Sequence, residues 1–387
     1  MREGWGHHKI DEFCLVTDYV ANGSFASLKE NVQYLDQLDF AMLIRYTDHA
    51  NGWNGRHKYV SESAYKFLRK SSLKPGDLIM ANVGDPGNAF LLPNLGMPTT
   101  LGPNSILIRA EKEITSNEFL HYFFLSLEGR QLIDEISAGA AQRKFNKTSF
   151  RGLTIPLPPL EEQQRIVAVL DEAFEGLARA RAHAEANLQN ARELFESYLF
   201  TVFSEGNWPE KTLNQISENL DRVRVPITKS NRVAGDIPYY GASGVVDHVA
   251  DFLFDEDLLL ISEDGANLLA RTYPIAFSIS GKAWVNNHAH VLRFPDLDTQ
   301  EFVRLYLNSI SLEPYVSGMA QPKLNQAQLN RIPIPFPDSA DRTEIVAKAE
   351  LLAAETEDLQ RRFEATLQDL DDLRQSLLQT AFAGELT

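Results

Sequence analysis

Cysteine is almost absent from this sequence of 387 residues, in which Cys14 is the single example. One cysteine cannot form a disulfide within the chain, so the disulfide-stabilised folds of small secreted proteins are excluded. No apolar run approaches the ~20 residues that a membrane-spanning helix needs. The opening residues 1–13 also lack the apolar segment of a secretory signal. We therefore expect a soluble protein of the cytoplasm.

The motifs of common enzyme classes are also missing. The sequence contains no Gly-x-Ser-x-Gly elbow, no P-loop, no His-Glu-x-x-His and no Asn/Asp-Pro-Pro-Tyr tetrapeptide of adenine methyltransferases. His7 and His8, like His288 and His290, lack a cysteine or carboxylate cluster at the spacing of a metal site, which favours isolated turn or surface histidines. We expect no catalytic residue, no metal and no cofactor on this chain.

Positive charge is scarce, because 37 Lys and Arg residues stand against 53 Asp and Glu residues and give a net charge of −16. The excess of acidic residues is distributed unevenly along the chain. Segments 161–203 and 339–387 carry −4 and −6, which leaves −6 for the remainder of the chain. Since the acids are concentrated in these two segments, the net charge does not exclude a nucleic-acid partner for the rest of the protein.

What the sequence does contain is a long internal repeat with an offset of 179 residues. Segment 139–167 aligns without a gap with segment 318–346. The identical pairs are Gly139/Gly318, Ala141/Ala320, Gln142/Gln321, Lys144/Lys323, Asn146/Asn325, Ile155/Ile334, Pro156/Pro335, Pro158/Pro337, Ile166/Ile345 and Val167/Val346. The unit is far longer than a solenoid repeat of ~20–50 residues. Each copy is therefore expected to be a globule followed by a helix.

Each copy runs into a segment with the pattern of a long helix. No proline occurs between Pro159 and Pro209, and the segment is rich in Ala, Glu, Gln, Leu and Arg. Apolar residues advance in alternating steps of three and four from Val167 to Val202, and more weakly in 346–381, which is a heptad seam. Two such helices most simply bury their seams against each other as an antiparallel pair.

Arg181 and Gln360 occupy equivalent seam positions near the midpoints of the two expected helices. A single polar layer can fix the register of a coiled coil. We expect these two residues to lie close together and to form such a layer, although two exposed polar residues at a splayed seam would fit the sequence equally well.

Together these patterns predict an α+β fold of two pseudo-repeated α/β globules, separated by two long helices that form an antiparallel coiled coil. The expected domains are a first globule, 1–154, a central helical region, 155–205, a second globule, 206–333, and a C-terminal helical region, 334–387. Buried strands are expected at 76–80 and 104–110, with 76–80 aligned over 256–260. Helices are expected at 116–137 and 299–310.

Polar and basic residues on expected turns are the candidates for function, because Arg, Lys, Asn and Gln pair with base edges and phosphates. The first globule offers a loop at 45–58 and the repeated segment, with Arg45, Asn51, Asn54, Arg56, His57, Lys58, Arg143, Lys144, Asn146 and Lys147. The second offers Asn267, Arg271, Lys282, Asn286, Asn287, His288, Lys323 and Asn325. Both copies retain Lys144/Lys323 and Asn146/Asn325, although a shared helix cap would explain the asparagines as well.

Three stretches carry a resemblance to a known family: IPLPPLEEQQRIVAVLD at 155–171, YYGASG at 239–244 and VNNHAHVL at 285–292. With the two globules and two helices, they resemble the specificity subunit of bacterial type I restriction-modification systems. The resemblance implies a non-catalytic DNA reader. Each globule would be a target recognition domain for one half of a bipartite site, and the helices would set the spacer.

The resemblance also implies partners. Two methyltransferase subunits would dock on the helical region, bind S-adenosylmethionine and methylate adenine at N6. Restriction subunits that use ATP and Mg would join them, so that cofactors and catalysis lie on other chains. Two alternatives remain: the specificity subunit of a type IIB-like system, and a coiled-coil scaffold whose globules bind proteins. Only a DNA reader would bind DNA with an affinity that falls steeply with salt.

Overall fold

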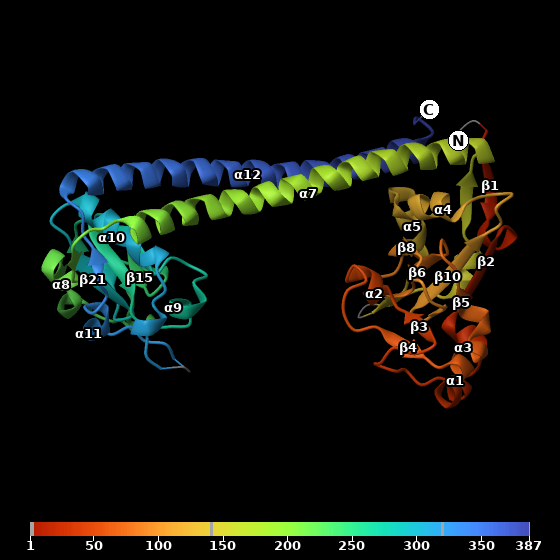
Figure 1. The fold of residues 1–387 in the computed structure, drawn as a ribbon, viewed down its shortest axis with the longest axis horizontal. Coiled ribbons are helices and arrows are strands. Elements are labelled where there is room, and N and C mark those ends of the chain that lie inside the picture. Colours follow the sequence, from red (N-terminus) through yellow and green to blue (C-terminus); the bar gives the residue numbers. More distant parts are fainter. Residues whose placement is uncertain (1–3, 140–141, 319–320, 387) are drawn as a thin grey trace. The chain divides into compact units, whose positions relative to one another are not determined.

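The computed structural model describes residues 4–139, 142–318 and 321–386. It divides into two compact units, residues 1–183 with 366–387 and residues 184–365. Both divisions fall inside a long helix, α7 (Leu160–Glu205) or α12 (Ser339–Ala383) (Figure 1). Each unit therefore contains one globule and a part of each long helix. Among the described residues, no helix is long and apolar enough to cross a membrane.

The first globule has two four-stranded sheets, β2-β10-β6-β8, which is antiparallel, and β4-β3-β9-β5, in which β3 and β9 are parallel. Its strands are β1 (Gly6–Lys9), β2 (Cys14–Asp18), β3 (Ala41–Ile44), β4 (Lys58–Val60), β5 (Ser72–Leu73), β6 (Leu78–Ala81), β7 (Val83–Gly84), β8 (Ala89–Leu91), β9 (Thr99–Leu101), β10 (Ser105–Ala110), β11 (Arg143–Lys144) and β12 (Thr154–Leu157). Its helices are α1 (Phe25–Asn31), α2 (Tyr46–Ala50), α3 (Glu62–Phe67), α4 (Asn117–Leu125), α5 (Leu127–Ile136) and α6 (Lys147–Arg151). The strands expected at 76–80 and 104–110 are confirmed as β6 and β10.

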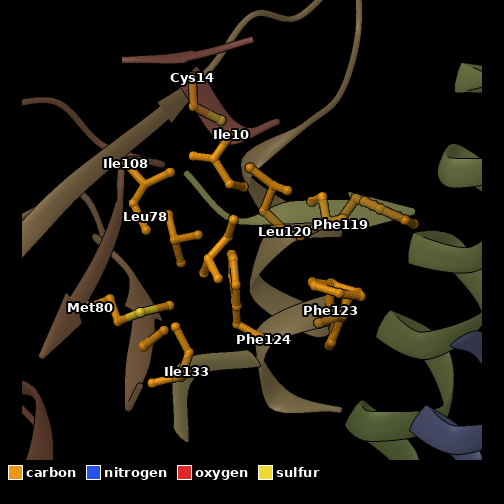
Figure 2. Close-up of a cluster of buried hydrophobic side chains, with 14 of the residues drawn as sticks. Ile10, Cys14, Leu78, Met80, Ile108, Phe119, Leu120, Phe123, Phe124 and Ile133 are labelled. Carbon is orange, nitrogen blue, oxygen red and sulfur yellow. The ribbon is translucent and has the colours of Figure 1, made fainter. Parts of the chain in front are cut away.

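The core of the first globule lies between α4 and the antiparallel sheet. Figure 2 shows Phe123 and Phe124 of α4 in the same cluster as Met80 of β6. All three side chains are fully buried. Burying an aromatic or long apolar side chain stabilises a fold by roughly 1.5–3 kcal/mol, so this face of α4 fixes the sheet that carries the strand ends described below.

The second globule repeats the topology of both four-stranded sheets. Its sheets are β14-β21-β18-β19, which is antiparallel, and β16-β15-β20-β17, in which β15 and β20 are parallel. Its elements are β13 (Glu210–Lys211), α8 (Leu213–Ile216), β14 (Glu218–Asn219), β15 (Ile237–Gly241), β16 (Gly244–Val249), β17 (Phe254–Asp255), β18 (Leu258–Ser262), α9 (Asn267–Ala270), β19 (Ala276–Ile279), β20 (Lys282–Val285), β21 (Ala289–Arg293), α10 (Leu297–Ser309), α11 (Gln326–Leu329) and β22 (Ile334–Pro335). The sequence repeat is therefore part of a fold repeat.

Two expectations about local structure need correction. The single helix expected at 116–137 is two helices, because Ser126 ends α4 and its hydroxyl caps α5 by accepting from the Gly129 amide at 3.2 Å. A Cβ on Gly129 would lie 2.1 Å from the Phe123 carbonyl oxygen, so the two helices meet at a close backbone contact. The loop expected at 45–58 contains the short helix α2.

The predicted heptad seam is the protected stripe of both long helices. Every seam residue of α7 from Val167 to Val202 is buried or half-buried, and among the equivalent seam residues of α12, from Val346 to Ala381, only Arg374 is exposed. In the first unit Leu170 shares a core with Phe382 of α12, and the Arg374 guanidinium lies 4.9 Å from the ring centre of Phe174. In the second unit, Leu199 of α7 shares a core with residues of α12.

The expected polar layer stays a prediction, since Arg181 belongs to the first unit and Gln360 to the second. Within the first unit Arg181 has a different partner, because its Nη1 lies 2.5 Å from the Asp371 carboxylate.

Buried polar residues fix the start of each long helix. Gln163 of α7 donates to the Pro158 carbonyl at 2.9 Å, and Arg342 of α12 donates to the Pro337 carbonyl at 2.6 Å. Gln163 and Arg342 occupy equivalent positions of the repeat, as do the two prolines. The shared proline therefore presents a carbonyl that a long polar side chain one helical turn later can bind.

Candidate nucleic-acid interface

The repeated segment forms the same tight hairpin in both globules. Ala138 bridges Lys144, and Ser317 bridges Lys323. Gly139 and Gly318 have φ values of 113° and 83°. A Cβ on these glycines would lie 2.5 and 2.7 Å from a backbone carbonyl oxygen across the hairpin. Both copies thus keep glycine because the backbone conformation of this position disfavours a side chain. The identical pair Ala141/Ala320 lies outside the described residues.

Backbone hydrogen bonds attach the hairpin to equivalent strand ends. The Phe145 amide donates to the Asn82 carbonyl at 3.1 Å, and the Leu324 amide donates to the Glu263 carbonyl at 2.8 Å. These bonds make Asn82 and Glu263 equivalent, with an offset of 181. The alignment of 76–80 over 256–260 is therefore wrong by one residue, which in a strand exchanges the two faces.

The asparagines that the two copies share are helix caps. Asn146 accepts from the Ser149 amide at 2.9 Å at the start of α6, and Asn325 accepts from the Gln328 amide at 3.0 Å at the start of α11. The sequence left open a shared helix cap as the role of this pair, and the structure shows that cap in both copies.

The shared lysines lie at the surface in different electrostatic surroundings. Lys144 is exposed and has no ion-pair partner in the described part of the chain, whereas the Lys323 ammonium lies 3.3 Å from the Glu263 carboxylate. The neighbouring cations of the first globule are paired, Arg143 with Asp134 at 2.6 Å and Lys147 with Asp18 at 2.8 Å. The Arg143–Asp134 pair is about half-exposed and therefore contributes little stability, whereas the Lys147–Asp18 pair is more buried. Arg143 can thus exchange its carboxylate for a phosphate more readily than Lys147 can.

The 45–58 loop separates into internal and surface residues. Asp48 is buried, and it is held by Arg45 at 2.6 Å and by His57 at 3.4 Å. Arg45 and His57 thus shape the loop. Asn51, Asn54 and Arg56 are exposed, and Lys58 is paired with Asp36.

Several candidates of the second globule support its loops. Arg271 donates to the Leu307 and Asn308 carbonyls at 3.3 and 3.4 Å at the end of α10, and burial lowers the pKa of this guanidinium. Asn267 donates to the Tyr273 carbonyl at 3.0 Å. The Asn286 side chain is buried and accepts from the His288 amide at 2.8 Å.

Surface candidates remain beside them. Asn287 and His288 are exposed, and so is Lys282, whose ammonium lies 4.7 Å from the centre of the Phe252 ring. The structure therefore brings Asn287, His288 and Lys323 to neighbouring loop ends and leaves Lys282 on another strand.

An ion network lies beneath these loop ends. The His290 ring Nδ1 lies 2.6 Å from the Asp221 carboxylate, and Arg224 lies 2.7 Å from the Glu263 carboxylate. Burial opposes ionisation of Asp221, but the hydrogen bond and charge of His290 prevail, and the pKa of Asp221 falls below its ordinary value. Ligand atoms of Asp221, Glu263 and His290 lie within 4.8 Å of one another, as in a metal site. Arg224 already supplies the positive charge there, so we assign no metal.

Sequence reasoning missed three polar residues of this region. Gln142 and Gln321 are identical in the two copies, exposed, and without a hydrogen-bond partner among the described residues. The fact that both copies of the repeat keep this glutamine is the sequence signal that could have identified the pair. Asp264 pairs with His288 at 2.9 Å, and no local pattern indicates that pairing across 24 positions of sequence.

Comparison with known proteins supports a single family. The sequence profile of the type I restriction modification DNA specificity domain matches residues 3–183 and 205–367. A putative type I restriction enzyme specificity subunit of Haemophilus influenzae is 36% identical over 169 residues, which cover 44% of this chain and 42% of that relative. The StySPI specificity subunit of Salmonella potsdam is 24% identical over 426 residues, covering 100% of this chain and 90% of its own length.

Solved structures support the same fold over the full length. A chain from work on complex assembly and conformational transition of the type I R-M system aligns with a TM-score of 0.72 at 19% identity, covering 100% of this chain and 99% of that chain. The HsdS subunit from Thermoanaerobacter tengcongensis aligns with a TM-score of 0.60 at 20% identity, covering 100% and 98%. With two matched domains that span most of its length, the chain belongs to the family of type I restriction modification DNA specificity subunits, which recognise DNA and are not themselves enzymes.

Proposed function

We propose that each globule reads one half of a bipartite DNA site. The observation that carries the proposal is the duplicated hairpin, which presents Lys144 in one globule and Lys323 in the other from the same backbone. The side chains at the adjoining strand ends differ, with Asn82 in the first globule and Glu263 in the second. A shared cation suits contact with phosphate, and different neighbours suit different base sequences.

The two long helices set the distance between the half-sites in this proposal. Their protected seams support an antiparallel coiled coil, with Arg181 and Gln360 as a polar layer near its middle. A rod that joins two readers fixes half-site spacing in the way that dimer geometry does in other DNA-binding proteins.

Two methyltransferase subunits would dock on the helical region and bring S-adenosylmethionine to the target adenine. Leu194 of α7 and Leu373 of α12 occupy equivalent positions and are 47% and 48% exposed, which supports two equivalent docking surfaces. Restriction subunits with ATP and Mg would complete the assembly. A cytoplasmic location, beside the chromosome, goes with this role.

The test is a genome-wide map of N6-methyladenine in a host without such methylation. The chain is expressed with the methyltransferase encoded beside it, and the methyltransferase alone is the control. We expect a bipartite motif that appears only when this chain is present. A stable complex without any motif would contradict the proposal and favour a protein-binding scaffold, and a partner that both methylates and cleaves would indicate the type IIB-like organisation.

A further inference from the structure

The second globule presents a cluster of polar side chains where β18 ends and the β20–β21 loop turns. Asp264 follows β18, and Asn287 and His288 precede β21. Asp264 also bridges Lys323 of the repeated hairpin. Three segments that are far apart in sequence thus meet at one surface, which we call the β18 tip.

Hydrogen bonds to backbone groups hold the β18 tip together. The His288 amide donates to the Asn286 side-chain Oδ1 at 2.8 Å, and the His288 carbonyl accepts from the Glu263 amide at 2.9 Å. The Gly265 amide donates to the Pro322 carbonyl at 3.0 Å. A side chain on such a tip is positioned before any ligand binds, which is what specific recognition requires.

Asp264 fixes the imidazole of His288. Both Asp264 carboxylate oxygens lie 2.9 Å from His288 Nδ1, so this nitrogen carries the hydrogen. The opposite nitrogen, Nε2, has no partner among the described residues, and the His288 side chain is 51% exposed. A carboxylate on one ring nitrogen sets the tautomer and leaves the other nitrogen as an acceptor in the neutral ring.

The first globule makes equivalent backbone hydrogen bonds there without this pair, although Asn104 has a left-handed φ of 67° and His288 does not. Asn104 takes the place of His288, because the Asn82 amide donates to the Asn104 carbonyl at 3.1 Å as the Glu263 amide does to that of His288. Val83 takes the place of Asp264, one residue after Asn82. The pair is therefore not needed for these backbone hydrogen bonds, since the first globule makes them without it.

We propose that His288, positioned by Asp264, is a specificity-determining residue for the half-site read by the second globule. Its Nε2 accepts a hydrogen bond from the exocyclic amino group of one base in the major groove, where adenine N6 and cytosine N4 are the available donors. The inference rests on the proposed function and adds to it a residue, a positioning partner and a base chemistry.

The test uses the methylation map with variants of the full chain in complex with its methyltransferase. His288→Ala is expected to make one base position of one half-site degenerate, with about a tenfold loss of discrimination, while the other half-site and the spacer stay as in the wild type. Asp264→Asn keeps an oxygen that accepts from Nδ1 and should retain most of the preference. Asp264→Ala should relax the same position as His288→Ala. His248→Ala changes an exposed histidine of β16 and should leave the motif unaltered.

Thermal unfolding of each variant separates specificity from folding, because a merely structural role would lower stability without relaxing a single base position. An unchanged motif in His288→Ala, or equal relaxation of both half-sites, would overturn the inference. If His288→Ala abolishes all methylation, His288→Gln is mapped in its place and judged by the same single position. A wild-type map with no bipartite motif would overturn the proposed function, and this inference with it.

Discussion

Gly139 is the residue whose backbone most restricts the repeated hairpin. Its φ of 113° lies outside the regions that side chains favour, and a Cβ would lie 2.5 Å from the Gln142 carbonyl oxygen. We expect Gly139→Ala to lower the free energy of unfolding by about 1–3 kcal/mol. Gly176→Ala is the matched control, because Gly176 lies inside α7 with open space around it. That substitution should raise stability by about 0.5–1 kcal/mol. Thermal unfolding measures the stability of both variants. An unchanged unfolding temperature of Gly139→Ala would contradict the expected backbone strain at this position.

Asp221 gives the second globule a stability that depends on pH. Its pKa in the folded protein lies below the ordinary value, because the opposing effect of burial is outweighed by His290 and by the amide of Val291. The ionised carboxylate therefore stabilises the fold above the ordinary carboxyl pKa, and this contribution is lost as the pH falls through the lowered pKa.

Asp221→Asn should cost about 3 kcal/mol at neutral pH, since it breaks a buried pair and leaves His290 with only the more distant Glu263 carboxylate, at 3.9 Å. Urea unfolding between pH 7 and about pH 3 measures the effect. The variant should lose less stability than the wild type on acidification. Asp236→Asn is the control, because Asp236 is exposed and has no ion pair within the described part of the chain. Parallel curves for Asp221→Asn and the wild type would argue against this role.

Retention of a residue in both copies indicates a shared role, which can be structural or functional. The shared Lys144 and Lys323 lie at the surface as a DNA contact requires, and the shared Asn146 is accounted for by helix capping. Arg45 and His57 were chosen from composition, but they hold the buried Asp48. The composition of a loop does not show whether one of its cations binds a buried carboxylate or is free to contact a ligand. The fold decides this, because it determines which carboxylate lies beside the cation.

At the scale of elements, Gln163 decides where α7 begins. Its amide donates to the Pro158 and Ile114 carbonyls at 2.9 and 3.0 Å, and its oxygen accepts from Thr115 at 2.6 Å. Gln163→Ala would leave two buried groups, the Pro158 carbonyl and the Thr115 hydroxyl, and one half-buried carbonyl, that of Ile114, without this partner. It should cost about 2–6 kcal/mol, since each buried unpaired group costs about 1–3 kcal/mol. The neighbouring Gln164 is exposed, so Gln164→Ala should change stability by less than about 0.5 kcal/mol. Equal effects of the two substitutions in chemical unfolding would show that the start of α7 is set elsewhere.

Long periodic elements were predictable, and close contacts between elements were not. The heptad seam of α7 follows from the spacing of its apolar residues, and it matches the protected stripe. The break between α4 and α5 depends on how closely Gly129 approaches the Phe123 carbonyl, and periodicity carries no record of that contact. The alignment of β6 with β18 failed by one residue because short apolar strands match in more than one register.

At the scale of the whole molecule, the proposed ruler converts helix length into DNA spacing. Seven helical residues span about 10.5 Å, which is close to the length of three base steps at about 3.4 Å each. A heptad also returns the seam to the same face of the helix, so a deletion of seven residues preserves the helix pairing in the proposed coiled coil. The length of the rod can thus be changed while both reading surfaces stay intact.

Removing 182–188 from α7 and the equivalent 361–367 from α12 should therefore shorten the methylated motif by about three base pairs, with both half-sites unchanged. Three base pairs also turn the duplex by about 100°, whereas a heptad hardly turns the coiled coil. The shortened protein can reach both half-sites only if the DNA or the rod twists, so we expect slower methylation as well as a shorter spacer. The methylation map measures the motif, and methylation at limiting expression measures the rate. A deletion of seven residues from α7 alone is the control, and it should abolish the motif by unpairing the seams. An unchanged spacer with altered half-site bases would refute the ruler, because reading and spacing would then reside in the same element.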